Sequence, residues 1–96
     1  MTTIQINVIL QPLHETPVSR MTWDEAQQYV TSLGPDWRLP TNEELEELQP
    51  NHFRDKCYWS GTENTPTEAN ICYAKKKGIR PNYKMNESYV RAVRTI

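Results

Sequence analysis

The chain has 96 residues, too few for two hydrophobic cores, so we expect a single domain. Only 36% of the residues are hydrophobic, but three Trp, five Tyr and one Phe can each bury a large area. No segment approaches the roughly 20 apolar residues of a membrane-spanning helix, and a net charge of −1 does not favour a polyanionic partner.

The first ten residues begin the predicted order of elements. Apolar residues alternate from Ile4 to Leu10, which predicts a half-buried strand, and the next segment reads as a proline-containing loop. Thr22 and Glu25 then have the spacing of a capping box, which predicts a helix over Trp23–Leu33. Gly34 and the proline after it are expected to end this helix.

A second capping box, formed by Thr41 and Glu44, predicts a second helix from Asn42 to about Gln49. Pro40 disfavours helical geometry at the residue before it, so the chain should enter this helix from an extended segment. Acidic residues in the first turn suit the helix dipole. Pro50 is expected to end the helix.

The second half of the chain changes to a period of two. Short strands are predicted at Cys57–Ser60, Ile71–Ala74 and Ser88–Arg94, with a weaker candidate over Arg80–Asn86. The segment Gly61–Thr67 is predicted to be a polar loop. Strand, helix, helix and then several strands predict an α+β domain with an antiparallel sheet.

Four motifs, in this order, resemble the family DUF1566, the C-terminal domain type of Legionella collagen-like protein. They are Met21–Ala26, Asp36–Leu45, Tyr58–Thr62 and Tyr89–Arg94, and together they cover most of the chain. The resemblance implies a compact C-type-lectin-like domain, in which two helices flank an antiparallel sheet and the N- and C-terminal strands pair. Only 28 residues separate Ser60 from Tyr89, so the loop that carries ligands in this family is expected to be short.

The residues of these motifs are expected to build the fold and not to bind ligands. The three tryptophans are predicted to be core anchors, and Arg38 is predicted to pair with Asp36 or Glu44. The alternative is that a ligand is contacted by Arg38, Arg91 and Arg94. The complete structural signature is Trp23, Trp37, Arg38, Leu39, Pro40, Thr41, Tyr58, Trp59 and Arg91.

Catalytic, metal and cofactor sites are not expected. Cys57 and Cys72 are predicted to be free thiols in a reducing compartment, with a disulfide as the alternative. The two histidines, His14 and His52, lack the spacing of a metal site and nothing marks a Cys–His pair. The tripeptide Gln49–Asn51 resembles a calcium-lectin motif, but it directly follows the second helix and is better explained as a helix stop.

We therefore expect a non-enzymatic binding module with a protein partner, bound through the segment Gly61–Asn70 and the strand Ile71–Lys77. The candidate contact residues are Thr62, Glu63, Asn64, Tyr73, Lys75, Lys76, Lys77 and Arg80. Short members of this kind look like products of bacteriophages or mobile elements, so occlusion of a host defence protein is one expected role. The N-terminus does not resemble a secretory signal, which implies the cytoplasm, in that case of an infected bacterial host.

Three alternatives accompany this hypothesis. A carbohydrate-binding or adhesin module on a virion or cell surface predicts an exposed aromatic residue within Gly61–Asn70. A nucleic-acid binder would use the Lys75–Lys84 region with Tyr73 and Tyr83, although lysines that protect a sheet edge explain this region more simply. A homodimer through an exposed edge strand is the third alternative, and no membrane partner is expected.

Overall fold

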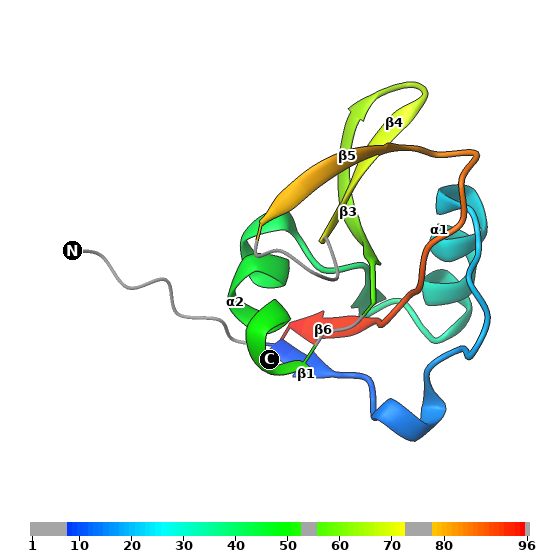
Figure 1. Ribbon diagram of the computed structural model, residues 1–96. Coiled ribbons are helices and arrows are strands. Elements are labelled where there is room, and N and C mark those ends of the chain that lie inside the picture. Colours follow the sequence, from blue (N-terminus) through cyan, green and yellow to red (C-terminus); the bar gives the residue numbers. More distant parts are fainter. Residues whose placement is uncertain (1–7, 53–55, 73–77, 96) are drawn as a thin grey trace.

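Two helices and two three-stranded antiparallel sheets form the part of the chain that the computed structural model describes, residues 8–52, 56–72 and 78–95 (Figure 1). The α+β class predicted from the sequence is therefore confirmed, with two sheets in place of one. The elements are β1 (Val8–Leu10), a 3-10 turn (Leu13–Glu15), α1 (Trp23–Ser32), β2 (Trp37–Arg38), α2 (Asn42–His52), β3 (Tyr58–Thr65), β4 (Glu68–Cys72), β5 (Ile79–Tyr83) and β6 (Val93–Thr95).

The first sheet joins the two ends of the described chain. Its order is β1-β6-β2, with Val8 opposite Thr95 and Leu10 opposite Val93. The expected pairing of the first and last strands is thus confirmed. The third strand, β2, places Trp37 opposite Arg94, and the sequence did not predict it because a strand of two residues has no periodicity.

The second sheet has the order β3-β4-β5, and its β3–β4 hairpin projects from the body of the molecule (Figure 1). The predicted polar loop over Gly61–Thr67 is wrong, since β3 continues to Thr65 and β4 already begins at Glu68. Pairing across the hairpin is irregular: Glu63 lies opposite Ala69, whereas the amides of Gly61 and Thr62 donate to the Pro40 carbonyl at 2.8 Å and to Ser60 Oγ at 2.9 Å. Threonine also suits an exposed strand surface because its side chain is β-branched.

Both predicted capping boxes are present. In α1 the Glu25 amide donates to Thr22 Oγ1 at 3.3 Å and the Thr22 amide donates to Glu25 Oε1 at 2.9 Å. In α2 the corresponding bonds between Glu44 and Thr41 measure 3.2 and 2.9 Å. Each box satisfies two backbone amides that lack partners within the helix.

The predicted ends of the helices are less accurate than their starts. Helix α1 ends at Ser32, one residue early, and Gly34 follows with a positive φ of 134°. Helix α2 continues through Pro50 to His52, so the predicted stop before Pro50 is wrong. A proline removes one amide donor and crowds the preceding turn, which disfavours a helix but does not exclude its last turn.

The core is centred on Trp59, which is fully buried between α1, the hairpin and the segment before β6. Its indole Nε1 donates to the Met21 carbonyl at 2.8 Å, and the Trp23 indole donates to the Ser60 carbonyl at 2.9 Å. Trp23 and Trp37 are partly buried and pack against this cluster, so all three tryptophans are core anchors as predicted. The buried members are Ala26, Val30, Leu39, Trp59, Ala69, Ile71, Val90 and Ala92.

The predicted last strand, Ser88–Arg94, differs from the structure. Regular pairing begins only at Val93, and Ser88 and Tyr89 form isolated bridges to Met21 and Tyr58. Residues 90–93 are all buried, although their alternation predicted two different faces. The segment passes through the core between the two sheets, so the side chains on both of its faces pack against other residues.

Cys57 and Cys72 carry free thiols and pack in different parts of the interior. Cys57 is half-buried against the Trp59 cluster, whereas Cys72 is fully buried with Leu45 and Tyr58 in a second, smaller cluster. Burial raises the pKa of the Cys72 thiol to about 11, because the thiolate would lose its hydration.

We expect a thiol reagent such as DTNB, used at mildly alkaline pH, to modify one thiol per folded chain rapidly. Cys57 lines an open pocket and is accessible, whereas Cys72 is buried and stays protonated. The second thiol should react only after unfolding in denaturant. The control is Cys57→Ser, which should show no fast reaction. Two fast thiols in the wild-type protein would contradict the buried position of Cys72.

Candidate binding site

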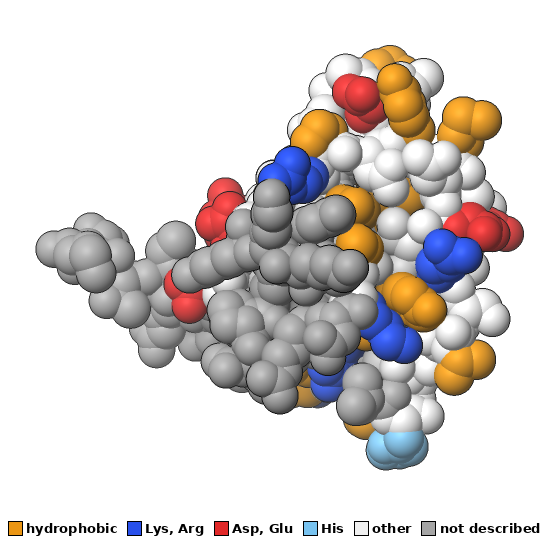
Figure 2. All heavy atoms as spheres, in the orientation of Figure 1, with side chains coloured by type: hydrophobic (Ala, Val, Ile, Leu, Met, Phe, Trp, Pro, Cys, Tyr) orange, Lys and Arg blue, Asp and Glu red, His pale blue; other side chains and the backbone are white. Residues whose placement is uncertain are grey.

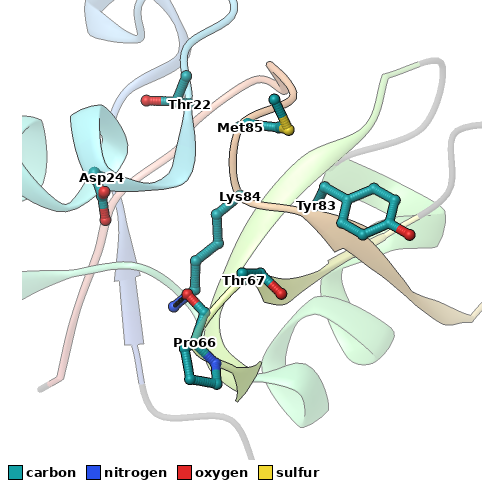
Figure 3. Close-up of a pocket in the computed structure, with 7 residues that line it drawn as sticks. All are labelled: Thr22, Asp24, Pro66, Thr67, Tyr83, Lys84 and Met85. Carbon is teal, nitrogen blue, oxygen red and sulfur yellow. Dashed lines mark hydrogen bonds between the residues drawn. The ribbon is translucent and has the colours of Figure 1, made fainter.

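An open pocket of about 580 Å³ lies where the start of α1, the β3–β4 turn and the end of β5 meet (Figure 3). We call it the hairpin pocket. Its lining residues come from three separate segments of the chain: Thr22, Asp24, Pro66, Thr67, Tyr83, Lys84 and Met85.

The backbone of Lys84 joins the three segments. Its amide donates to the Thr67 carbonyl at 2.9 Å, and its carbonyl accepts from the Trp23 amide at 3.2 Å. A tight turn follows, in which the Asn86 amide donates to the Tyr83 carbonyl at 3.0 Å. The relative positions of the hairpin turn and the α1 start therefore depend on main-chain hydrogen bonds, which gives the pocket a defined shape.

The side chain of Lys84 extends toward Pro66 (Figure 3) and is held by three contacts. Its ammonium group donates to the Glu63 carboxylate and, at 3.0 Å, to the Pro66 carbonyl. It also lies 4.5 Å from the centroid of the Trp23 ring, in cation–π geometry. Because only 12% of this side chain is exposed, Lys84 is not available as the phosphate contact that the nucleic-acid alternative required.

The rim of the hairpin pocket is apolar and exposed. Tyr83 is 57% exposed and Met85 is 81% exposed, and Pro66 in the hairpin turn is also exposed. Figure 2 shows hydrophobic side chains at the upper end of this face, where the hairpin and the segment after β5 lie. Side chains of these types are enriched in the centres of protein interfaces, especially Tyr and Met.

The predicted contact residues are only partly brought together. Glu63 reaches the hairpin pocket through its ion pair with Lys84. Thr62 and Asn64 belong instead to a polar network in which Ser60 and Asn64 connect to Asn42 and Asn70. Arg80 is exposed on β5, opposite Ile71 on β4. The remaining four candidates, Tyr73, Lys75, Lys76 and Lys77, lie outside the described residues.

Five residues of the hairpin pocket lie outside the predicted binding segments Gly61–Asn70 and Ile71–Lys77. Thr22 was assigned only to a helix cap, Asp24 and Met85 were not singled out for binding, and Tyr83 and Lys84 were considered only for nucleic-acid binding. One signal was available, because Tyr83 and Met85 flank Lys84 in a segment with weak strand patterning. The meeting of this segment with the start of α1 had no signal in the sequence.

A second pocket of about 300 Å³ lies around Cys57. Its cationic residues are Arg20 and Lys56, and the Lys56 ammonium lies 4.4 Å from the centroid of the Tyr89 ring. The sequence did not mark a Cys–His pair, and the side chain of His52, which such a pair with Cys57 would need, lies outside the described part of the structure. The other lining residues are Ile71, Asn82, Glu87 and Ser88.

The arginines of the family motifs have structural contacts. Arg38 forms a two-point ion pair with Glu44, with N–O distances of 2.7 and 2.8 Å, which confirms the predicted fork. It also donates to Thr95 Oγ1 at 3.0 Å and so connects α2 to β6. Arg91 is buried, and its Nε donates to the Gln11 carbonyl at 2.9 Å.

The described ranges contain neither a metal-binding cluster nor a membrane-spanning helix. No group of three or more His, Cys, Asp or Glu side chains there is arranged to hold a metal ion. None of the helices in the same ranges has the length and apolar character that crossing a bilayer requires.

Comparison with known families identifies the family of this chain. The chain matches the family described as the Lcl C-terminal domain over residues 7–94, which is most of its length. All four motifs noted in the sequence fall inside this range. No curated protein matches the chain.

Proposed function

We propose that this chain, which belongs to the Lcl C-terminal domain family, is a non-enzymatic binding module for a protein partner. The observation that carries the proposal is the exposed apolar rim of the hairpin pocket, made by Pro66, Tyr83 and Met85. Single exposed apolar residues are common on protein surfaces, but a group of them around a pocket is typical of an interaction site.

A compact C-type-lectin-like fold is part of this proposal. Pairing of β1 with β6 and the two helices support it, because that fold closes its terminal strands in the same way. In such a domain the projecting hairpin would present the binding surface, while Trp59 and the Arg38–Glu44 ion pair maintain the scaffold. Separation of the binding surface from the scaffold allows the surface to be varied in experiments without unfolding the domain.

The finer form of the proposal concerns biological role. A domain from a bacteriophage or mobile element would occlude a host defence protein in the cytoplasm of the infected bacterium. Support comes from the composition of the pocket, whose exposed apolar groups suit the covering of another protein's surface. The test is inhibition of a purified partner by one equivalent of the chain; a partner that is bound and remains fully active would contradict occlusion.

We expect the double variant Tyr83→Ser, Met85→Ser to lose its protein partner in affinity capture from bacterial lysate. Recovery of the partner, measured by quantitative mass spectrometry, should fall about tenfold or more, since loss of one interface anchor costs at least ~1.4 kcal/mol. The matched control is Val18→Ser, which also removes an exposed apolar side chain but lies outside the hairpin pocket.

The two variants should have the melting temperature of the wild-type protein, because all three replaced side chains are exposed. A partner captured equally well by the wild-type protein, the control and the double variant would show that this surface is not used. Failure of the wild-type protein to capture any protein in stoichiometric amount would contradict the proposed function itself.

A carbohydrate-binding role is the second candidate function. Its predicted aromatic residue within Gly61–Asn70 is absent from the sequence, so that prediction is wrong. Tyr83 lies next to this segment, opposite Glu68 on β4, and its exposed ring beside Thr22 and Thr67 would suit stacking on a sugar. Glycan-array binding that disappears in Tyr83→Ser would favour this function over protein binding.

Nucleic-acid binding and homodimerisation have less support. Lys84 is engaged by Glu63, so a nucleic-acid surface would depend on Lys75, Lys76 and Lys77 and on Arg80. Retention on heparin with a steep salt dependence, lost when the three lysines are replaced, is its test. A dimer through the β5 edge is disfavoured by Pro81, because proline provides no amide for pairing with another strand.

A further inference from the structure

We propose that the hairpin pocket accepts a lysine or arginine side chain of the partner protein, with its cationic end at Asp24. This inference rests on the proposed function, since it specifies the chemistry of the same binding surface. The aliphatic part of the side chain would lie along Pro66, Tyr83 and Met85. The partner is therefore expected to present a basic residue flanked by apolar residues.

Charge is the first feature of the pocket that favours a basic side chain. Asp24 is exposed in the first turn of α1 and, within the described part of the chain, its carboxylate has neither a hydrogen bond nor an ion pair. Among the described residues of the lining, Lys84 is the other charged one, and Glu63 already balances its charge. The pocket is thus left with one uncompensated carboxylate, which favours a cationic ligand and disfavours an anionic one.

The position of Lys84 is the second feature that favours a basic side chain from outside. A lysine in the same pocket would be the natural partner of Asp24, but its ammonium group is held by Glu63 and the Pro66 carbonyl. The Trp23 ring adds a cation–π contact on another side. These contacts keep Lys84 from forming an ion pair with Asp24 within 4.0 Å, so the carboxylate stays open to a group from outside.

Shape and polarity of the pocket also match a basic side chain. Asp24 lies on the α1 side of the pocket, whereas Tyr83 and Met85 lie on the opposite side (Figure 3). Lysine and arginine have the same division, because a long apolar stem carries a charge at its end. An arginine guanidinium can also stack on an exposed tyrosine ring. The volume of about 580 Å³ is ample for one such side chain and its neighbours.

The test is an NMR titration of the ¹⁵N-labelled full chain with three short capped peptides. Each has the sequence Gly-Leu-X-Leu-Gly, with arginine, glutamine or glutamate at X. We expect saturable shifts at the amides of Thr22, Thr67 and Met85 with the arginine peptide. The glutamine peptide should bind about fivefold more weakly, as expected for loss of an ion pair worth ~1 kcal/mol at a partly exposed site, and the glutamate peptide weaker still.

Variants of Asp24 test the assigned contact. Asp24→Asn should lower the affinity for the arginine peptide to that of the glutamine peptide, and Asp24→Glu should retain the preference. The control Glu43→Gln removes a carboxylate from the same position of the other helix, the second residue of α2, and should change nothing. Because all of these residues are exposed, circular dichroism should show unchanged folding.

Three results would overturn the inference. They are equal affinity for the arginine and glutamine peptides, an unchanged preference in Asp24→Asn, and the absence of saturable shifts around the pocket with any peptide. None of them would refute protein binding, which the capture experiment with the Tyr83→Ser, Met85→Ser variant tests independently. If that variant lost partner capture while the arginine and glutamine peptides bound with equal affinity, the hairpin pocket would still be the protein interface. Only the proposed basic residue of the partner would be refuted.

Discussion

Replacement of Trp59 by alanine is expected to lower the free energy of unfolding by about 4 kcal/mol, the range for truncation of a large buried aromatic residue. Trp59 is fully buried at the centre of the main core cluster. Truncation would leave a large cavity and would also remove the hydrogen bond to the Met21 carbonyl. Small domains commonly have a total stability of only about 5–15 kcal/mol, so much of the protein could unfold at physiological temperature.

Urea unfolding followed by far-UV circular dichroism would measure this loss without depending on tryptophan fluorescence. Trp59→Phe is the informative control, because it retains an aromatic ring but cannot donate to Met21. Its cost should be clearly smaller, roughly 1–2 kcal/mol. Val18→Ala, at a side chain that is 90% exposed, should stay within about 0.5 kcal/mol of the wild-type protein. A loss below about 1 kcal/mol for Trp59→Ala would contradict the central role assigned to this residue.

Replacement of Glu44 by alanine is expected to cost about 2 kcal/mol, because one carboxylate serves two structural purposes. It accepts from the Thr41 amide in the capping box and forms the two-point ion pair with Arg38. The ionic part of the loss is modest, since 37% of the Arg38 side chain is exposed and solvent screens the pair. Glu43→Ala, in the same turn but exposed, is the matched control and should cost well under 1 kcal/mol.

The same contact should make stability depend on acid pH. Hydrogen bonds from Arg38 and Thr41 hold the pKa of Glu44 below its usual value of 4.5. The contribution of ionised Glu44 to the free energy of unfolding is therefore complete above the unfolded-state pKa of this residue. It is lost as pH falls through the lower folded-state pKa. Urea midpoints across acid pH should fall less steeply in Glu44→Gln than in the wild-type protein. Some pH dependence of stability should remain in Glu44→Gln, because the hydrogen bonds between Glu25 and Thr22 also lower the pKa of Glu25. Identical pH profiles for the two proteins would contradict this assignment.

The parts of the fold that the sequence predicted depend on short-range interactions. A capping box needs two side chains three residues apart, so the starts of α1 and α2 could be located from Thr22, Glu25, Thr41 and Glu44 alone. The Arg38–Glu44 pair spans six residues across one helix start. Burial of Trp59 followed from its size and its place in a strand-like motif.

The incorrect predictions concern interactions between distant segments. The polar residues up to Thr65 belong to a strand because β4 returns alongside them, and local polarity does not indicate that pairing. Strand β2 exists because β6 lies next to it, although nearly sixty residues separate them. Residues 90–93 do not alternate between buried and exposed positions, because core side chains cover them on both sides.

The sequence by itself determined the family, the α+β class, the starts of both helices and the aromatic anchors of the core, because capping, periodicity and side-chain size act locally. Tertiary structure alone decided which surface residues meet. The hairpin pocket combines three distant segments, represented by Thr22, Pro66 and Tyr83. They meet because the backbone of Lys84 connects the hairpin turn to α1. The open carboxylate of Asp24 has the same origin, since the fold directs the side chain of Lys84, which lines the same pocket, to Glu63.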